Sequence, residues 1–499
     1  MSWHRAVPGL TGLGLGVLVL GPALKPGFVL SYDMVFVPDP PVTAAMFGRT
    51  GGFPRQVPSD AVAASLSWLL PWSQQLILLT IFVLAAWGIA RLLPGGLVAK
   101  LAGIAFFLWN PYVAERLLLG QWALLLGYAG LPWVLDAIVR LRDRHGTLRL
   151  AAALLPSAVG GFAAMNLTLL VVAGALIAQR GRGALRVLPV FAVMALPWLI
   201  PALFAGSAST DPAGVDLFVA RADTPFGTLG SLLSLGGIWN AETVPLAFGS
   251  LPTVTGRLLL SLAAIAVVLW RRRPDDRGLC LAALAGLAIA CLGITEPGRA
   301  TLRALVGFSP GFAVLRDGQL YLGPLALLEA VGLGLLAERL GTSGILLAVA
   351  PVALLPTMAW GVGGELRPVD FPADLRAAQQ LINADPEPGK ALSLPWGAYR
   401  RPEWNHGRAA LDPLPRMLGR PTVWNDGLMV GDRALDQENP LAKTVDGLIR
   451  TPGPLAEPLT RAGYRYVVIS KDGQTDAWRE RFTGARIVLD GPTVIVIML

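Results

Sequence analysis

Repeated long apolar runs are the feature that most constrains this chain of 499 residues. They recur along the first 360 residues, each followed by a short basic cluster, and about 20 apolar residues suffice to cross the hydrocarbon core of a bilayer. Only 15% of the residues are charged, whereas soluble domains carry about a quarter. So little charge cannot cover a water-facing surface, and the sequence predicts a polytopic α-helical membrane protein.

The apolar runs predict eleven spans. We expect them near residues 6–28, 62–90, 97–112, 120–139, 150–165, 167–179, 187–206, 254–270, 278–294, 321–337 and 343–361. The first run, Ala6 to Leu24 after Arg5, resembles a signal peptide. It is long, and no small-x-small cleavage site closes it before Lys25, so we interpret it as an uncleaved helix.

Basic residues predict the orientation of the spans. With the N-terminus inside, the inner segments carry 15 basic and four acidic residues, the asymmetry typical of cytoplasmic loops. The basic ones are Arg5, Arg91, Lys100, Arg140, Arg142, Arg144, Arg149, Arg180, Arg182, Arg186, Arg271, Arg272, Arg273, Arg277 and Arg339. An odd number of spans then places the C-terminus outside the cytoplasm, in a multi-pass protein of the plasma membrane.

The net charge of +8 belongs to the membrane part, because residues 365–499 carry 17 basic and 17 acidic residues. There is no basic stripe with interleaved aromatic residues, so nucleic acid is not an expected partner. Cys280 and Cys291 lie in one apolar segment and support neither a disulfide framework nor a zinc site.

The chain divides into a membrane part, 1–365, and a small extracytoplasmic α/β domain, 366–499. In the second part, Tyr464–Ser470 reads as a strand after a helix at 453–462, and Asp490-Gly491-Pro492 as the turn of a closing hairpin. The long polar loops, 29–61, 207–253 and 295–320, and a short turn at 110–119 all fall on the outer face. Chemistry is therefore expected there.

The first outer loop carries Asp33 and Asp39, six residues apart, and Asp60 before the second span. A carboxylate at the membrane edge can act as general base on an acceptor hydroxyl, so Asp33 and Asp39 are candidate catalytic residues. The alternative is a solvated loop acid or a helix cap, which we favour for Asp60.

The second outer turn, WNPYVAERLLLGQW, places Glu115 and Arg116 in an apolar stretch, with Tyr112 and Gln121 nearby. Ionisable groups at such a position usually face a cavity or a partner. Glu115, Arg116 and Gln121 are therefore candidate substrate-binding residues. The alternative is local pairing that orients the turn.

The third outer loop ends with Arg316, Asp317 and Gln319 before an apolar helix. A guanidinium binds phosphate oxygens bidentately, so Arg316 is a candidate for a lipid-linked phosphate, with Arg299 and Arg303 as helpers. Asp317 and Gln319 are candidate substrate ligands. The alternatives for Arg316 are a neighbour pair with Asp317 or an interfacial, snorkelling arginine.

Two polar residues stand within apolar runs. Asn166, in GGFAAMNLTLL, is expected at the outer end of two helices, where it can reach a sugar hydroxyl or satisfy backbone groups at a helix break. Glu329 is a functional candidate by default. In the tail, PWGAYRRPEWNHGRAALDPLPR and PTVWNDG have the aromatic and polar residues of carbohydrate sites, or of an ordinary packed domain. His406 has no metal-ligand partner at useful spacing.

Together these features resemble the C-type (GT-C) glycosyltransferase superfamily. The phrases SYDMVFVPDP, NPYVAERLLLGQW, GGFAAMN and VLRDGQLYLGP resemble actinobacterial cell-envelope members, including arabinofuranosyl- and mannosyltransferases, and the composition fits a high-GC actinobacterium. The family often has paired acids in the first loop. Because Asp33 and Asp39 are six apart, the identity of the base and any divalent metal requirement stay open.

The resemblance implies a transferase that uses a polyprenyl-phosphate sugar, arabinofuranose or mannose, as donor. An envelope glycan or glycolipid is the implied acceptor, and the reaction inverts the anomeric centre in one displacement. Asp33 is implied as the base and Arg316 as the phosphate ligand, and the two must converge in one crevice at the outer membrane edge. The C-terminal domain is implied to bind or present the growing glycan.

Two other functions remain compatible with the sequence. A transporter or flippase of lipid-linked precursors needs an ionisable pathway through the membrane, and only Glu329 and Arg257 are candidates inside the spans. A non-catalytic scaffold of envelope assembly fits the unpaired first-loop acid. Substitution of Asp33 by Asn separates these functions.

Overall fold

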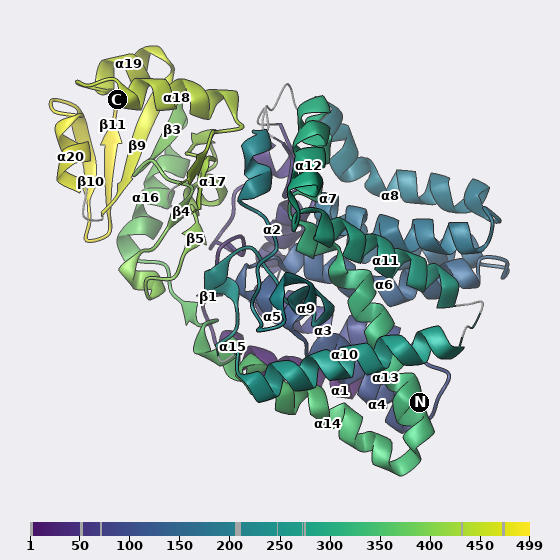
Figure 1. Cartoon of the computed structure of the whole chain (residues 1–499). Helices are drawn as coiled ribbons and strands as arrows, with labels where there is room; N and C mark the ends of the chain where they lie inside the picture. Colours follow the sequence, from purple (N-terminus) through teal and green to yellow (C-terminus); the bar gives the residue numbers. More distant parts are fainter. Residues whose placement is uncertain are drawn as a thin grey trace. The chain divides into compact units, whose positions relative to one another are not determined.

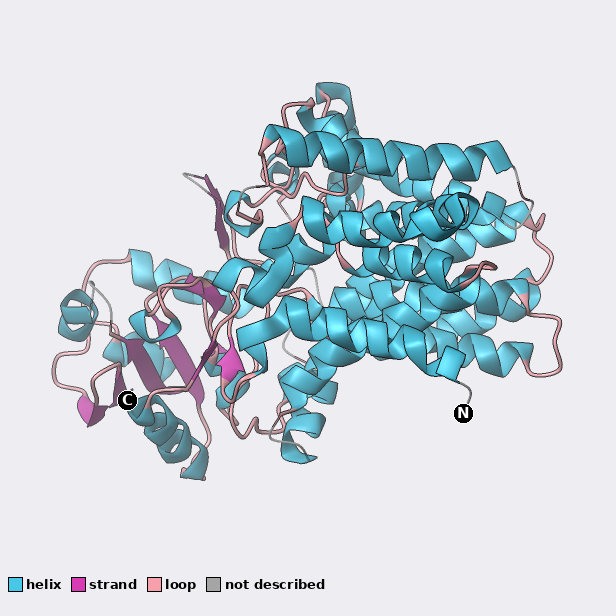
Figure 2. Ribbon diagram, turned by 90° about the horizontal axis from the view of Figure 1, so that it is seen from below, coloured by secondary structure: helices cyan, strands magenta, loops and turns pink. Residues whose placement is uncertain are grey.

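The structure is a computed structural model of the whole chain, and it describes residues 3–49, 53–69, 72–204, 211–246, 248–271, 273, 276–430, 433–471 and 475–499. The chain forms two compact units, each described below by itself. The membrane unit comprises Met1–Leu24, Gln75–Leu199 and Pro212–Leu366, and the sheet unit comprises Lys25–Gln74, Ile200–Asp211 and Arg367–Leu499. Figure 1 shows the helices and strands along the chain, and Figure 2 shows how the strands gather within the sheet unit.

The membrane unit is built of helices. In chain order its helices are α1 (Trp3–Leu20), α3 (Ser73–Leu92), α4 (Leu97–Leu108), α5 (Pro111–Leu118), α6 (Trp122–Val139), α7 (Gly146–Ala178), α8 (Ala184–Phe204), α9 (Gly227–Leu233), α10 (Leu251–Arg271), α11 (Arg277–Leu292), α12 (Glu296–Phe308), α13 (Gly323–Leu340), α14 (Ile345–Leu354) and α15 (Ala359–Gly364). Short 3-10 helices join them: η1 (Gly21–Leu24), η3 (Pro212–Asp216), η4 (Ala241–Thr243), η6 (Pro310–Leu315), η7 (Gly318–Leu322), η8 (Gly341–Gly344) and η9 (Pro356–Met358).

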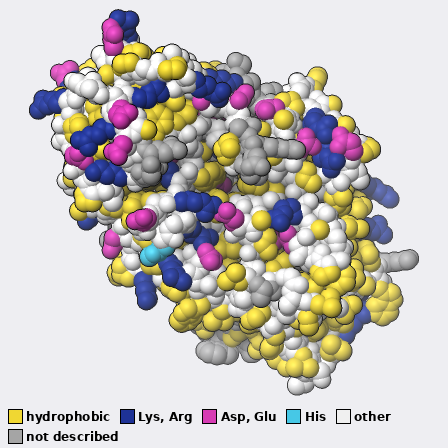
Figure 3. Space-filling view, turned by 60° about the vertical axis from the view of Figure 1, so that its left-hand side comes forward, with side chains coloured by type: hydrophobic (Ala, Val, Ile, Leu, Met, Phe, Trp, Pro, Cys, Tyr) yellow, Lys and Arg dark blue, Asp and Glu magenta, His cyan; other side chains and the backbone are white. Residues whose placement is uncertain are grey.

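Among the described residues, eight helical segments are long and apolar enough to cross a membrane, or nine if the bent pair α11 and α12 counts as one. Their outer surfaces are apolar: in α8, for example, Leu185 is 94% exposed and Val193 is 61% exposed. Figure 3 shows broad areas of hydrophobic side chains with few charges among them. Exposed apolar surface of this extent requires lipid, so the prediction of a multi-pass membrane protein is confirmed.

Helix α7 extends over 33 residues but is not straight, because it bends sharply within its length. Gly161 has non-helical angles, φ 72° and ψ −147°, and the hydroxyls of Ser157 and Thr168 lie 2.7 Å apart. In a straight helix, residues eleven positions apart are separated by about 16 Å. The two arms of α7 therefore fold toward each other at Gly161. They correspond to the helices predicted at 150–165 and 167–179, with the break earlier than expected.

The prediction of one helix over 62–90 is wrong, because the chain forms two helices there, α2 (Ser59–Leu69) and α3. Pro71 stands in the interval, outside the described residues, and a proline disfavours helix in the residue before it. The count of eleven spans stays a prediction, because the bent α7 and the segment Gly318–Leu354 are each long enough to contain two of the predicted helices.

The helices of the membrane unit approach closely through small residues. A Cβ at Gly332 of α13 would lie 2.1 Å from the backbone oxygen of Ala264 in α10, and one at Gly286 of α11 would lie 2.1 Å from that of Tyr321. Glycine at these positions lets backbones touch, as is typical of packing within membranes.

The sheet unit contains a five-stranded mixed sheet of order β10-β11-β9-β3-β6. Its strands are β3 (Lys390–Leu394), β6 (Thr422–Val423), β9 (Tyr464–Ser470), β10 (Arg486–Asp490) and β11 (Val494–Met498). Strand β3 is parallel to β6 and β9, whereas β11 is antiparallel to both β9 and β10. The predicted strand 464–470 and the hairpin around Asp490-Gly491-Pro492 are confirmed.

Helices cover both faces of this sheet. Tyr466 and Val468 of β9 pack with Ile382 of α16, whereas the alternate residues Val467 and Ile469 pack with Leu459 of α19. Successive residues of a strand point to opposite faces, so the continuous apolar run in β9 follows from burial on both sides. The sheet unit as a whole contains the helices α2, α16 (Ala373–Ala384), α17 (Leu414–Met417), α18 (Pro440–Arg450), α19 (Ala456–Arg461) and α20 (Thr475–Glu480), with η2 (Ala44–Phe47) and η10 (Glu403–Asn405).

The first loop is an integral part of the sheet unit. Strand β1 (Phe28–Val29) pairs antiparallel with β2 (Pro368–Val369), and Leu30, Val35 and Val37 belong to the same hydrophobic core as α16. Four further short strands form two antiparallel pairs: β4 (Tyr399–Arg400) with β5 (Ala410–Leu411), and β7 (Leu428–Val430) with β8 (Arg433–Leu435). Residues separated by most of the chain thus share one core.

Candidate functional site

Asp33 lies at the tip of a tight turn. The backbone N–H of Met34 donates to the Ser31 oxygen at 2.9 Å, and the N–H of Ser31 donates to the Met34 oxygen at 3.2 Å. Tyr32 and Asp33 are the two central residues, and Tyr32 has φ 45°, which is uncommon for a residue other than glycine. The surrounding structure therefore holds this turn against a local preference.

Strand β5 provides that restraint. The N–H of Tyr32 donates to the Ala409 oxygen at 2.7 Å, and the N–H of Leu411 donates to the Tyr32 oxygen at 2.9 Å. Strand β5 also pairs with β4, where Tyr399 lies opposite Leu411. The turn, β5 and β4 thus form one small ladder, which brings Tyr399 beside Asp33.

The Tyr399 hydroxyl donates to Asp33 Oδ1 at 2.7 Å, and the rings of Tyr32 and Tyr399 lie 5.6 Å apart. Burial, and then the negative charge of Asp33, raise the pKa of Tyr399 well above its ordinary value. The hydroxyl therefore stays protonated and keeps donating. Asp33 itself is partly exposed, so its carboxylate is both held and accessible.

Further ionisable groups surround this pair. The Arg55 guanidinium contacts both carboxylate oxygens of Glu438 at 2.6 Å, and its charge lowers the pKa of Tyr399 against the larger upward effects. Asp426 accepts from the backbone N–H of Asn439 at 2.8 Å. The sequence did not predict the pair of Arg55 and Glu438, because residues 383 positions apart carry no common motif.

The other first-loop acids have different surroundings. Asp39 is exposed and lines an open depression of about 420 Å³ beside α16, where the Gln379 amide donates to its backbone oxygen at 3.3 Å. Asp60, in the first turn of α2, accepts from Arg416 Nε at 2.9 Å. Among these three acids, Asp33 has the surroundings that suit a base.

In the membrane unit, five predicted site residues meet. Arg116 is fully buried, and its guanidinium donates to Asp317 at 2.8 and 3.2 Å, to Gln121 at 2.7 Å and to Gln319. The Gln319 amide also donates to Glu115 at 2.8 Å. The turn at 110–119 and the loop 295–320 are thereby joined, although Arg116 and Asp317 are 201 positions apart.

Helix α5 carries Glu115 and Arg116 of this cluster, and two residues fix where the helix starts. Asn110 caps the helix by accepting from the N–H of Val113 at 3.0 Å, and Pro111 occupies the first helical position. Glu115 Oε1 and Arg116 Nε are buried and make no hydrogen bond among the described residues. Buried polar atoms are nearly always hydrogen-bonded, so such atoms suit a site for a polar ligand.

Arg257 of α10 belongs to the same region and was not predicted as a site residue. It donates to the Leu354 oxygen at 2.8 Å and to the Phe248 oxygen, and its guanidinium carbon lies 4.3 Å from the centre of the Phe248 ring. It lies in the first half of α10 and interacts electrostatically with Glu115.

Arg316 stacks on an aromatic pair. Its guanidinium carbon lies 4.5 Å from the centre of the Phe218 ring, which in turn packs edge-on against Trp239 at 4.6 Å. The neighbouring Asp317 carboxylate is bound by Arg116. Stacking on an aromatic ring fixes the plane of a guanidinium.

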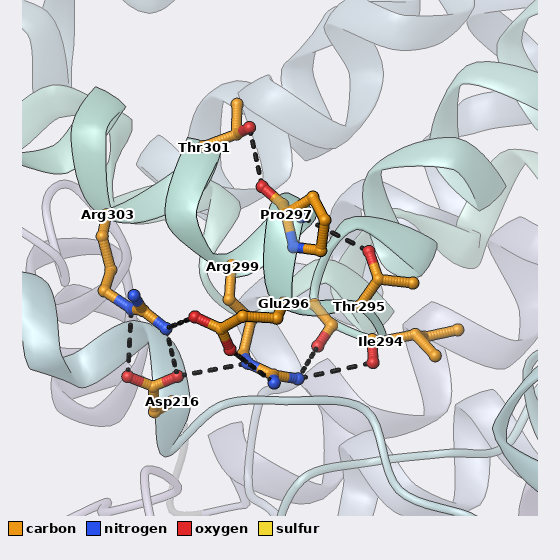
Figure 4. Close-up of polar contacts among 10 residues, drawn as sticks. Asp216, Ile294, Thr295, Glu296, Pro297, Arg299, Thr301 and Arg303 are labelled. Atoms are coloured by element: carbon orange, nitrogen blue, oxygen red, sulfur yellow. Dashed lines mark hydrogen bonds and ion pairs between the residues drawn. The ribbon is translucent and has the colours of Figure 1, made fainter.

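Arg299 and Arg303, one turn apart on α12, are paired with two acids (Figure 4). Glu296 contacts both guanidinium groups at 2.7 Å, and Asp216 contacts Arg299 at 3.4 Å and Arg303 at 3.2 Å. Two arginines and two carboxylates have no net charge. The cluster as folded therefore offers a phosphate no excess positive charge, and the helper role stays a prediction.

The remaining candidates lie within helices. The Asn166 amide donates to the Phe162 oxygen at 2.9 Å, just beyond the bend of α7. Asn166 thus satisfies a backbone group at a helix break, which was one of its two expected roles. Glu329 accepts from Ser261 at 2.9 Å and is fully buried. Across the described residues, no three His, Cys, Asp or Glu side chains are grouped to hold a metal ion. Asp33 and Arg316 belong to different units, so their convergence stays a prediction.

The structure, a bundle of apolar helices with a small three-layer α/β unit, has a fold like that of solved GT-C membrane glycosyltransferases. The chain is similar to solved structures of the arabinofuranosyltransferase AftD from Mycobacteria. One has TM-score 0.62 and 16% identity, covering 100% of this chain and 40% of that chain, and a second has TM-score 0.58 and 17% identity, covering 100% and 41%.

ArnT from Cupriavidus metallidurans in the apo state is a more distant match, with TM-score 0.47 and 14% identity over 98% of this chain and 97% of that chain. This chain spans about 40% of the length of AftD. No family model matches its sequence, and no curated protein matches it. The GT-C resemblance seen in the sequence is thus confirmed as a likeness of fold.

Proposed function

We propose that this protein is a membrane glycosyltransferase. It transfers a sugar from a polyprenyl-phosphate donor to a hydroxyl of a cell-envelope glycan or glycolipid, on the outer face of the plasma membrane. The GT-C fold supports the class of reaction. The observation that carries the proposal is the Asp33 carboxylate, partly exposed at the tip of a strained turn and held by the Tyr399 hydroxyl at 2.7 Å.

Asp33 acts as the general base. A base must be held within reach of the proton that it removes, and it must be open to the acceptor. The acceptor oxygen, deprotonated by Asp33, attacks the anomeric carbon as the bond from that carbon to the phosphate breaks. Attack opposite the leaving group inverts the configuration in one displacement. The proton ends on Asp33 and the electron pair on the lipid phosphate.

Arg316 binds the leaving phosphate. Charge develops on the phosphate as the glycosidic bond breaks, and a pre-oriented guanidinium stabilises that charge without reorganising. The Phe218 ring provides the orientation. Asp317, the next residue, is bound by the buried Arg116, so the cluster of Glu115, Arg116 and Gln319 positions the loop that carries Arg316.

Arabinofuranose is the first sugar to test, because the solved structures with the higher TM-scores are those of an arabinofuranosyltransferase. Mannose, with the same lipid carrier, is the second. The assay uses the full-length protein in lipid nanodiscs, a polyprenyl-phosphate sugar and an arabinan or mannan oligosaccharide as acceptor.

The deciding variant is Asp33→Asn. It keeps the size of the side chain and removes the base, so we expect transfer to fall by about 100-fold or more while the unfolding temperature is unchanged. Asp39→Asn is the matched control, because it makes the same charge change six residues further along the loop at an exposed position. We expect it to retain most of the activity.

Undiminished transfer by Asp33→Asn would remove Asp33 from the mechanism. A loss in Asp39→Asn alone would give the role of base to Asp39. If the wild-type protein transfers neither sugar in nanodiscs but, when reconstituted in closed lipid vesicles, moves a lipid-linked sugar across their bilayer, the proposed transferase is overturned in favour of a flippase.

A further inference from the structure

Helix α12 leaves the direction of the helix before it. Helix α11 starts at Arg277, close in sequence to Arg271 and Arg273, and is apolar to Leu292; α12 then begins at Glu296, bent from α11 by 96°. Figure 1 shows α12 running across the direction of α11. The two helices pass as a candidate span only as a bent pair. With α11 as the spanning part of that pair, α12, at a right angle to it and at the end far from Arg271, Arg273 and Arg277, lies along the plane of the membrane.

The surface of α12 divides into three arcs at 100° per residue. The first arc is buried, the second carries all the charges, and the third is exposed and uncharged. The buried arc contains Gly298, Leu302 and Val306; the charged arc contains Glu296, Arg299 and Arg303; the exposed arc contains Pro297, Ala300, Thr301, Ala304, Gly307 and Phe308.

Two of these arcs face the rest of the membrane unit. Leu302 and Val306 pack on Val215, together with residues of η6. The charged arc is bound to Asp216, beside Val215 on η3, by the ion pairs in Figure 4. The apolar and the charged sides of α12 therefore both have partners within the protein.

The third arc of α12 is exposed, and its composition indicates what surrounds the helix. Phe308 is 84% exposed, and Phe312, shortly after the helix, is 36% exposed. The exposed face of a helix in water normally carries charged residues, but this arc has none. An uncharged helix face at the end of a span is the surface that meets the boundary between lipid headgroups and acyl chains.

We propose that α12 is an interfacial helix whose exposed arc lies in the headgroup–acyl boundary of the leaflet at that end of α11. The occupant of the arc is lipid. The helix is followed by η6 and then Arg316, so its anchoring sets the depth of that guanidinium at the level of phospholipid phosphates. This inference does not depend on sugar transfer.

The test measures the depth of single nitroxide labels in the full-length protein, reconstituted in phosphatidylglycerol/phosphatidylcholine nanodiscs. Cys280→Ala and Cys291→Ala remove the native thiols. Labels are placed through Ala300→Cys, Ala304→Cys and Phe308→Cys on α12, and through Leu281→Cys, Leu284→Cys and Ala288→Cys on the exposed side of α11. Collision with oxygen, which partitions into lipid, is compared with collision with a water-soluble nickel chelate.

We expect the α11 labels to change depth by about 10 Å between residues 281 and 288, at 1.5 Å per residue. The α12 labels should lie near the phosphate level and differ by less than about 5 Å between residues 300 and 308, allowing for the usual tilt of spans. A change of about 12 Å along α12 would make it part of a span and overturn the proposal.

Two further outcomes overturn it. Labels on α12 that collide freely with the nickel chelate and little with oxygen face water. Labels shielded from both reagents are covered by protein, which would assign the arc to a second copy or another subunit. Thr301→Cys, on the same arc, replaces Phe308→Cys if that variant does not fold.

Discussion

Tyr399 and Asp33, 366 positions apart in the chain, share a hydrogen bond of 2.7 Å in which the phenol is the donor. The contact exists because β4 and β5 carry Tyr399 to the turn that β5 itself restrains. A hydrogen bond to a charged acceptor contributes about 1.5–3 kcal/mol. The orientation of the proposed base therefore depends on a residue that never touches the substrate in the proposed reaction.

Tyr399→Phe removes this donor and keeps the ring. We expect kcat to fall by about 10- to 100-fold with KM unchanged, because only the orientation of the base is lost. Since the pKa of Tyr399 lies well above its ordinary value of about 10, the wild-type hydroxyl stays a donor through pH 9. The ratio of wild-type to variant kcat should then be constant from about pH 7 to 9. A proportional change in KM would assign Tyr399 to substrate binding instead.

The buried pair of Arg116 and Asp317 predicts an asymmetric response to substitution. Arg116→Leu leaves Asp317 and Gln319 without their donor, and we expect it to lower the free energy of unfolding by about 3–5 kcal/mol. The double variant with Asp317→Leu removes both charges and should recover part of this loss. Thermal unfolding in detergent gives the comparison. Equal losses in the single and double variants would show that the ion pair is not the cause.

Asp385 predicts a dependence of stability on pH. It accepts from Arg465 at 2.6 Å and Tyr466 at 2.7 Å, and the Arg465 hydrogen bond, then that of Tyr466, holds its pKa below the ordinary range. A carboxyl group with a depressed pKa stabilises the folded state above its unfolded pKa of about 3.9, and this contribution is lost as the pH falls below that value.

Asp385→Asn should therefore lower the unfolding temperature most between about pH 5 and 7, and the difference from wild type should shrink below about pH 4. Glu480→Gln, at an exposed position of α20, is the control and should show no such trend. A difference between Asp385→Asn and wild type that is the same at every pH would contradict the assignment.

Gly332→Ala tests the close approach of α13 and α10. The added methyl would meet the Ala264 backbone oxygen, and backbone cannot give way as a side chain can, so we expect a destabilisation of about 1–3 kcal/mol. Gly14→Ala in α1 is the matched control, since no heavy atom of another element lies within 4 Å of its Cβ position. It should be neutral or slightly stabilising. The measurement is the unfolding temperature of the two variants in detergent.

The parts of the fold that the sequence predicts are those encoded locally. The strand Tyr464–Ser470 shows as a continuous apolar run because both of its faces are buried, and the membrane segments show as runs that only lipid can solvate. The bend of α7 at Gly161 carries a weak signal, because glycine is also common in unbent membrane helices. The sequence therefore predicts the break near Asn166, five residues beyond the observed bend at Gly161.

The site was predictable only as separate residues. Glu115, Arg116 and Asp317 could be selected because ionisable groups are costly near a membrane, but no spacing in the sequence says that Asp317 would bind Arg116. The same holds for Tyr399, which donates to Asp33, and for Arg55, which pairs with Glu438. Such contacts are set by tertiary structure, and a single sequence contains no periodic pattern that reports them.

The pairing of the Asp33 turn with β5, and of β5 with β4, has a consequence for the order of events in biosynthesis. The ribosome makes Asp33 early, yet the backbone partners of its turn, Ala409 and Leu411, emerge only after every intervening helix has been made. A chain that stops short of β5 lacks the backbone groups that restrain Tyr32, however well its helices insert. Under the proposed mechanism, every product of translation that ends before β5 is therefore inactive.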